Sequence, residues 1–325
     1  MTPDDVRRVL ATAVRAPSVH NTQPWRFAVT GDVLEVHADR TRQLHAQDPD
    51  GRELVLSCGA AALHARLAVR GLGRDCRTTW LPDEQDRDLV ARLEVGGPRP
   101  ATPDEQRLLE AVELRHTDRS AFAADPVAAG LVDELRAAAE HEGGWLADEQ
   151  RPDQVLGVEV LVSRADRALR RDAAVREELR GWVRGGLASD DGVPVDALPD
   201  EGRGRGSSLE LRSFDPDAGR EQPAADAPPA AEHPLLLVLG TPAETPADWA
   251  RAGAALARVL LTATSRGLVA NPQTQVMEVP SLRASLRSTL GLAGEPQVLL
   301  RIGWPRGPGS PRTGRRPVEA VLDQG

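Results

Sequence analysis

The hydrophobic pattern of this chain stops near residue 100 and starts again after Pro103. Each part contains a helix rich in Ala and Leu that ends in Arg-Gly-Leu, at residues 70–72 and 266–268. A β-prone segment follows each of these helices. A length of 325 residues corresponds to about two domains. We therefore expect two loosely related halves, residues 1–100 and residues 101–325.

The first half is predicted to alternate between helices and strands. Apolar residues recur at helical spacing behind an acidic first turn, and two short apolar runs flank a Gly-Asp turn that is typical of a hairpin. A charged stretch that reaches residue 96 carries no predicted element. The predicted elements are a helix at 4–15, strands at 26–29 and 33–37, a helix at 51–70 and a strand at 76–81.

The second half is predicted to hold more helix and a long insertion. Residues 154–187 form one long helix or two, and residues 188–232 are dominated by Gly, Pro, Asp and Ala. Because that composition buries little apolar surface, we expect a long loop or lid there. The other predicted elements are helices at 104–114, 127–141, 248–266 and 281–290 and strands at 234–240 and 297–303.

The charge balance excludes one class of partner. All 40 basic residues are arginine, since the chain has no lysine, and 49 acidic residues bring the formal charge to −9. Nonspecific nucleic-acid binders need a basic surface, so net acidity argues against that function. We expect small-molecule ligands and no nucleic acid.

Other features favour a cytoplasmic protein without a membrane span. The longest strongly apolar run, residues 235–239, is far shorter than the roughly 20 residues that cross a bilayer. The N-terminus carries acids where a signal peptide has a basic region. Cys58 and Cys76 are too few for a disulfide scaffold or a cysteine-rich metal site. We therefore expect no metal site and no membrane partner.

Four polar clusters are candidates for chemistry. Residues 16–25 place Ser, His, Asn, Thr and Gln between an apolar helix and a strand. Residues 115–119 join two arginines, an imidazole and a hydroxyl just after a helix, and arginine forks suit phosphate and planar carbonyl groups. Residues 271–275 are predicted to lie in a loop after the helix that stops at Gly267, and Arg312, Arg315 and Arg316 form a basic tail. Each cluster alone is also compatible with a solvated turn, loop or tail.

Two of these clusters together resemble the nitroreductase superfamily, whose members bind FMN. Residues 17–25 read Pro-Ser-x-x-Asn-x-Gln-Pro-Trp, similar to the family's Pro-Ser-Ser-x-Asn-x-Gln-Pro-Trp turn. Residues 115–122 read Arg-His-Thr-x-Arg-x-x-Phe, similar to the family's opening motif. The opening motif ordinarily comes first, whereas here it comes second. This inverted order resembles the Acg-like subfamily.

The resemblance implies the fold class and a single composite site. It implies an α+β, nitroreductase-like fold with antiparallel-type sheets flanked by helices, in which the two halves mimic the family's intertwined dimer. Each half carries one of the two motifs, and residues 143–145 read Gly-Gly-Trp where the second half would need the turn. We therefore expect a monomeric pseudo-dimer that binds one FMN.

The resemblance also implies which residues contact FMN. One group holds the phosphate and the ribityl chain, one contacts the isoalloxazine ring, and one offers backbone N–H groups near flavin N5. Arg119 matches the family's basic residue at the N1/O2 edge. The implied contacts are Arg115, His116 and Thr117 for the phosphate and the ribityl chain, Arg119 for the ring edge, Pro17, Ser18, Val19 and Asn21 for the ring, Thr274 and Gln275 near N5, and Arg315 and Arg316 on the phosphate.

Two functions follow from the resemblance. The first is hydride transfer from NAD(P)H through FMN to a nitroaromatic or quinone-like acceptor, with no catalytic side chain because the flavin carries the chemistry. The alternative is an FMN storage or sequestration protein, in which residues 188–232 act as a lid that blocks the substrate face.

Overall fold

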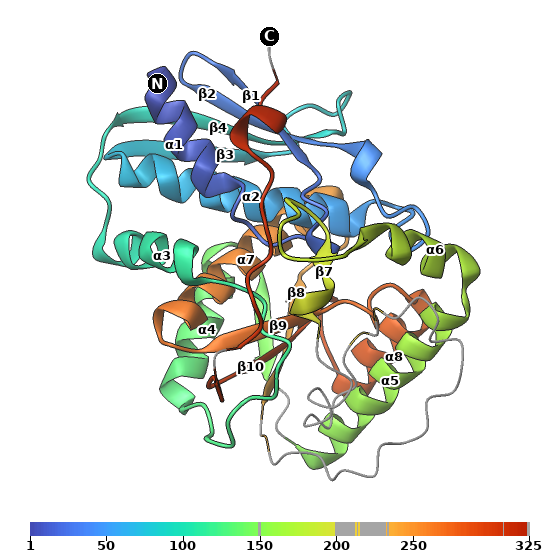
Figure 1. The fold of residues 1–325 in the computed structure, drawn as a ribbon. Helices are drawn as coiled ribbons and strands as arrows, with labels where there is room; N and C mark the ends of the chain where they lie inside the picture. Colours follow the sequence, from blue (N-terminus) through green and yellow to red (C-terminus); the bar gives the residue numbers. More distant parts are fainter. Residues whose placement is uncertain are drawn as a thin grey trace.

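Two four-stranded antiparallel sheets lie on opposite sides of a central pair of long helices (Figure 1). The computed structural model describes residues 1–148, 151–198, 212, 214, 232, 234–307 and 309–323. In this part of the chain, helices and antiparallel sheets are both present, and the expected α+β class is confirmed.

The first sheet is built from residues before the restart. Its strands lie in the order β1-β2-β4-β3, and all neighbours are antiparallel. The elements are α1 (Pro3–Ala13), η1 (Val19–Asn21), β1 (Trp25–Thr30), β2 (Val33–Ala38), η2 (Arg40–Arg42), α2 (Arg52–Gly71), β3 (Arg74–Trp80) and β4 (Leu89–Pro98).

The second sheet repeats this topology, with the order β5-β8-β10-β9 and a long helix between its second and third strands. An insertion separates its first two strands. The elements are α3 (Pro103–Leu114), α4 (Ala129–His141), β5 (Trp145–Asp148), α5 (Pro152–Arg171), α6 (Ala173–Trp182), β6 (Val183–Arg184), β7 (Val193–Pro194), η3 (Val195–Ala197), β8 (Leu235–Thr241), α7 (Pro246–Ser265), β9 (Val269–Gln273), α8 (Pro280–Leu290), β10 (Glu295–Gly303) and η4 (Val318–Ala320).

Three helices begin with the same local signal. Thr2, Thr102 and Thr245 each precede a proline, and an acidic residue follows three positions after each threonine. In all three cases the threonine side chain accepts a hydrogen bond from the acidic residue's backbone N–H, and the acidic side chain accepts one from the threonine N–H. This capping box satisfies two backbone donors that the helix itself leaves free. The sequence thus fixes where α1, α3 and α7 start.

Several expectations from the sequence were wrong in detail. The charged stretch before residue 96 is strand β4, because its charges alternate with buried apolar residues, and the Arg92 guanidinium pairs with Glu35 on the neighbouring strand at 2.8 Å. Residues 271–273 belong to β9 and not to a loop. Residues 154–187, predicted as one long helix or two, form two helices, and these end at Trp182 and not at residue 187. Strand β5, which no pattern predicted, pairs with β8.

The two halves meet where α2 crosses α7, in the centre of Figure 1. The contact is made backbone to backbone, at Gly59 of α2 and Gly253 of α7. A Cβ atom added at Gly59 would lie 2.0 Å from the Ala250 carbonyl oxygen, and one at Gly253 would lie 1.8 Å from the Leu56 carbonyl oxygen. Residues of α7 complete the core under the first sheet, while Leu56 of α2 belongs to the core under the second. The two cores are therefore closed by one shared helix pair.

The chain also crosses between the halves at its C-terminal end, where it runs back to the first sheet (Figure 1). The Phe27 N–H of β1 donates to the Val321 carbonyl, and the Asp323 N–H donates to the Phe27 carbonyl, both at 2.8 Å. None of the helices in the described part of the chain is long and apolar enough to span a lipid bilayer. The boundary at residues 100/101 falls between β4 and α3 and stays a prediction.

We expect Gly59→Ala to destabilise the protein by about 3 kcal/mol or more, because the added methyl group meets backbone that cannot turn aside. Urea unfolding of the purified variant measures this. Gly181→Ala is the matched control, since a Cβ there meets open space and alanine is the better helix former. Equal stability of the two variants would contradict the close crossing.

Candidate functional site

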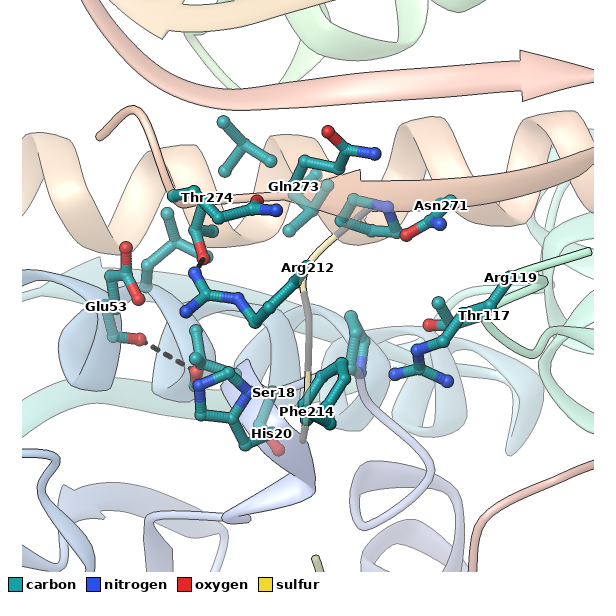
Figure 2. A pocket seen from close by; sticks show the side chains of 18 residues that line it. Ser18, His20, Glu53, Thr117, Arg119, Arg212, Phe214, Asn271, Gln273 and Thr274 are labelled. Carbon is teal, nitrogen blue, oxygen red and sulfur yellow. Dashed lines mark hydrogen bonds between the residues drawn. The ribbon is translucent and has the colours of Figure 1, made fainter. Parts of the chain in front are cut away.

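The two motifs meet in one cavity between the halves, although about one hundred residues separate them in the sequence. The turn at residues 17–20, which connects α1 to β1, forms one wall, and Thr117 and Arg119 form another. Residues 271–275, at the end of β9, complete it (Figure 2). The Asp118 N–H donates to the Ala270 carbonyl at 3.0 Å, which fixes the opening motif along the edge of the second sheet.

The turn before β1 has an unusual backbone. His20, Asn21 and Gln23 have φ angles of 48°, 55° and 50°, in the left-handed region that costs a non-glycine residue about 1 kcal/mol or more. Contacts from distant segments hold it there. The Asn21 amide donates to the Gly192 carbonyl at 3.1 Å, and its oxygen accepts from Arg315 at 3.0 Å. The insertion and the C-terminal tail thus both brace the turn.

Three guanidinium groups that line the cavity or an adjoining pocket are largely removed from water and have no carboxylate partner among the described residues, unlike Arg312 of the same pocket, which is exposed. They belong to Arg115, Arg119 and Arg315. Arg115 is only 7% exposed, and its Nε atom has no hydrogen-bond partner. Burial lowers the pKa of Arg115 and of Arg119 to about 10, and burial together with the charge of Arg115 lowers the pKa of Arg315 to about 9. Buried cations without a counter-charge are costly, so this end of the site is built for an anion.

The opposite wall offers amides. Gln273 and Gln275 are buried, and neither the oxygen nor the nitrogen of either side-chain amide has a partner in the protein. Buried polar groups normally find partners, so these atoms indicate a polar ligand or water at this position. The Thr274 hydroxyl, between them, donates to Glu278 at 2.7 Å.

Two residues of the insertion lie within the cavity wall (Figure 2). Arg212 forms an ion pair with the buried Glu278 carboxylate and donates to the Gln47 side chain at 3.0 Å. The Phe214 ring meets the His20 ring edge-on, with centroids 5.5 Å apart, and lies 5.6 Å below the Arg119 guanidinium carbon. Most of the predicted lid at 188–232 lies outside the described residues, so the lid itself stays a prediction.

The structure brings together eleven of the twelve predicted cofactor contacts. Their roles toward FMN remain predictions. The residues that line the cavity or the adjoining pocket are Pro17, Ser18, Val19, Asn21, Arg115, His116, Thr117, Arg119, Thr274, Gln275 and Arg315. Arg316 is not among them, because its guanidinium donates to the carbonyls of Gln23 and Ala320.

Sequence reasoning missed several residues of the wall, among them Glu53, Arg212 and Phe214, whereas Gln273 lies in the predicted cluster 271–275. Glu53 carried one signal, a charged residue at the start of an otherwise apolar helix. The insertion pattern gave no signal for Arg212 or Phe214, because their position depends on how a long loop returns to the core. His20 was expected to be a satisfied hydrogen-bonding residue. Its ring nitrogen indeed contacts the Gln47 oxygen at 2.9 Å.

Comparison with known proteins decides the family. The Nitroreductase family model matches residues 112–304. "Putative NAD(P)H nitroreductase Rv3131" of Mycobacterium tuberculosis is 36% identical over 325 residues, which cover 98% of this chain and 91% of the relative. The chain belongs to the nitroreductase family.

Two further matches are less similar in sequence, and only the first of them extends over nearly the whole chain. The acg protein of the same organism is 29% identical over 333 residues, covering 99% of this chain and 96% of its own. The crystal structure of the nitroreductase NfnB from sphigopyxis sp. strain HMH is 21% identical and covers 67% of this chain and 98% of that one, with a TM-score of 0.40. The resemblance to the Acg-like nitroreductases is thus confirmed.

We expect inorganic phosphate to stabilise the flavin-free protein, because binding only to the folded state raises its melting temperature. A rise of a few degrees at millimolar phosphate is expected for the wild type and for Arg8→Gln, an exposed control. Arg115→Gln should lose most of this rise. A thermal-shift titration with a matched chloride series measures it, and an unchanged response in Arg115→Gln would show that the anion binds elsewhere.

Proposed function

We propose that this chain binds one FMN between its halves and works as an NAD(P)H oxidoreductase of the nitroreductase type. The observation that carries the proposal is the set of three guanidinium groups without a carboxylate partner, at one end of a cavity formed by both family motifs. A bound flavin supplies hydride acceptance and donation, which no side chain of the site could perform.

The residues present fit FMN in charge and position. Arg115 and Arg315 would hold the phosphate, since both line the polar pocket that adjoins the cavity. The turn at 17–19 and the segment 271–275, on opposite walls, would hold the ring between them. Arg119 lines both pockets, so its guanidinium would stand at the N1/O2 edge, where negative charge develops on reduction.

One site per chain is expected because the second half lacks the turn. Trp25 and Trp145 each open the first strand of their sheet. Gly143 and Gly144 precede Trp145 where the turn would stand, and the Trp145 ring lies against Gly240, at which an added Cβ would come within 2.0 Å of the ring. At the start of β5 the second half thus has a Gly-Gly-Trp segment packed on its own sheet and not a polar turn. The matching sheet topologies support a monomeric pseudo-dimer.

A second candidate function, FMN sequestration, is favoured by Arg212 and Phe214. Both residues come from the insertion and line the cavity. The ion pair of Arg212 with a fully buried carboxylate is costly to break, because separation leaves an unpaired buried charge. A substrate that needs this space would have to displace both side chains. The acceptor class, nitroaromatic or quinone-like, and the choice between NADH and NADPH belong to the same proposal.

Replacing both covering side chains distinguishes turnover from sequestration. The double variant Arg212→Ala, Phe214→Ala is expected to bind FMN and to raise steady-state NAD(P)H oxidation with a nitroaromatic by about tenfold or more, if displacement of the pair limits access. Leu187→Ala, an exposed residue of the same insertion, is the control. Activity in the wild type supports the reductase. If neither the wild type nor the double variant oxidises NAD(P)H while FMN is bound, sequestration is supported. A protein that stays colourless with added FMN rules out both functions.

Point substitutions are preferable to deletion of the insertion. Residues 190–192 hydrogen-bond the turn at 21–23, so a deletion would remove the brace together with the cover.

Arg119→Met is expected to weaken binding of reduced FMN more than of oxidised FMN. Loss of a fixed cation beside developing negative charge should cost about 1–2 kcal/mol, which lowers the two-electron potential by about 20–40 mV. Arg119→Lys keeps a positive charge at this position, so its two-electron potential should stay close to that of the wild type. Spectroelectrochemical titration measures all three proteins, and equal weakening of both redox states in Arg119→Met would contradict the assigned position.

A further inference from the structure

Glu53 faces two cavities from the first turn of α2. On one side it lines the proposed flavin cavity (Figure 2). On the other side it lines a separate groove between residues 46–53 and the helices α7 and α8. We call this the α8 groove. No other residue lines both spaces, among those that the structure describes.

The groups packed around Glu53 carry more acid than base. Glu53, Asp48 and Glu278 face Arg52 and Arg212. Glu53 is 2% exposed and Asp48 is 5% exposed. With all five groups ionised, the cluster would hold a net charge of −1 away from water. Uptake of one proton removes that charge, and burial strongly favours the neutral cluster.

Two neighbouring carboxyls accept hydrogen bonds that stabilise a negative charge, although burial raises the pKa of Asp48 as well. An Asp48 oxygen accepts from the Leu54 N–H at 2.9 Å, at the start of α2, where the helix dipole favours negative charge. A Glu278 oxygen accepts both from Arg212 and from the Thr274 hydroxyl. These contacts stabilise the negative charge on the neighbours of Glu53.

Glu53 is the best placed of the three carboxyls to deliver a proton, because it alone of the three lines the flavin cavity. One of its oxygens accepts from Arg52 at 2.7 Å, while the other is buried and has no partner. Burial and the neighbouring Glu278 carboxylate raise the pKa of Glu53 well above its usual range. His20, the other titratable group on this wall, cannot replace it, since burial and the charge of Arg212 lower its pKa to about 4.

We propose that Glu53 supplies the proton that an acceptor in the flavin cavity takes up, and that it regains this proton from water in the α8 groove. The inference rests on the proposed oxidoreductase function. Hydride from NAD(P)H, supplied by way of a bound flavin, would convert a quinone into a hydroquinone anion. The Glu53 O–H bond then breaks as the second hydroquinone O–H bond forms. The Glu53 carboxylate that remains is reprotonated through the groove, so the sum is one NAD(P)H, one proton and one quinone consumed.

The arrangement explains how a covered cavity can receive protons. With Arg212 and Phe214 in its wall, the flavin cavity is shielded on the insertion side. The α8 groove reaches Glu53 from a different direction, past Asp48 and Trp249. The path of the proton is thereby separate from the path of the organic substrates.

The first test looks for the proton itself. Infrared spectroscopy of the flavin-free and the FMN-loaded protein at pH 7 should show the C=O stretch of a buried protonated carboxyl. This band should be absent from Glu53→Gln and present in Glu295→Gln, the control, whose carboxylate lines the groove but pairs with Arg287. A wild-type spectrum without the band, or a band that survives in Glu53→Gln, overturns the proposal.

The second test separates the two half-reactions by anaerobic stopped flow. Reduction by NAD(P)H needs no proton, so Glu53→Gln should reduce within about twofold of the wild-type rate. Reoxidation by para-benzoquinone should slow by about 100-fold, the usual contribution of a positioned acid, and Glu53→Asp should recover part of it. Unchanged reoxidation in Glu53→Gln overturns proton donation.

The outcomes keep the two proposals apart. If NAD(P)H fails to reduce the wild-type flavin, the oxidoreductase function fails, and dithionite-reduced protein still tests Glu53 by its reaction with quinone. A wild-type protein that quinone cannot reoxidise overturns both. The reoxidation rate should fall as the pH rises and Glu53 loses its proton. Glu278→Gln should shift this fall to lower pH, since it removes the carboxylate that disfavours ionisation of Glu53. A purely structural Glu53 would not shift this profile.

Discussion

The backbone contact between α2 and α7 is the constraint on which the rest of the molecule depends. Gly59 and Gly253 allow the helices to approach until the carbonyl of each touches the other. This contact sets the distance between the two sheets, and therefore between the turn that precedes β1 and the strand end that follows α7. Neither motif forms a site alone. The cavity exists because one helix crossing holds the two walls at a fixed separation.

The site that results is polarised along its length. One end gathers guanidinium groups that lack carboxylate partners, and the other gathers carboxyls around Glu53 and Glu278. Each imbalance is costly in a buried environment, and each therefore predicts something that restores neutrality. At the cationic end it is a phosphate. At the acidic end it is a proton, which the proposed reaction consumes.

The insertion between β5 and β8 has two physical roles in the described residues. Asp190 and Gly192 accept hydrogen bonds from Gln23 and Asn21 and so stabilise a turn with left-handed backbone. Arg212 and Phe214 contact the cavity directly. The same segment thus supports the binding site and restricts it, which is why stability and access have to be tested with separate substitutions.

The sequence by itself determined the local structure and the inventory of motifs. Thr-Pro-x-Asp and Thr-Pro-x-Glu start three helices, and the hairpin, the long helices and both family motifs follow from short-range patterns. It missed β4 and β5, because their charged or short segments become strands only when a neighbouring strand pairs with them.

Only the tertiary structure decided what the motifs meet. In the sequence, Arg115 is one of many arginines. The fold buries it and places no carboxylate beside it among the described residues. In the sequence, Glu53 is an ordinary acidic residue at the start of a helix. The fold brings Glu278, more than two hundred residues later, close enough to raise the pKa of Glu53. Local patterns depend on nearest neighbours in the chain, whereas charge balance and desolvation depend on neighbours in space. The proposed functions of Arg115 and Glu53 depend on their neighbours in space.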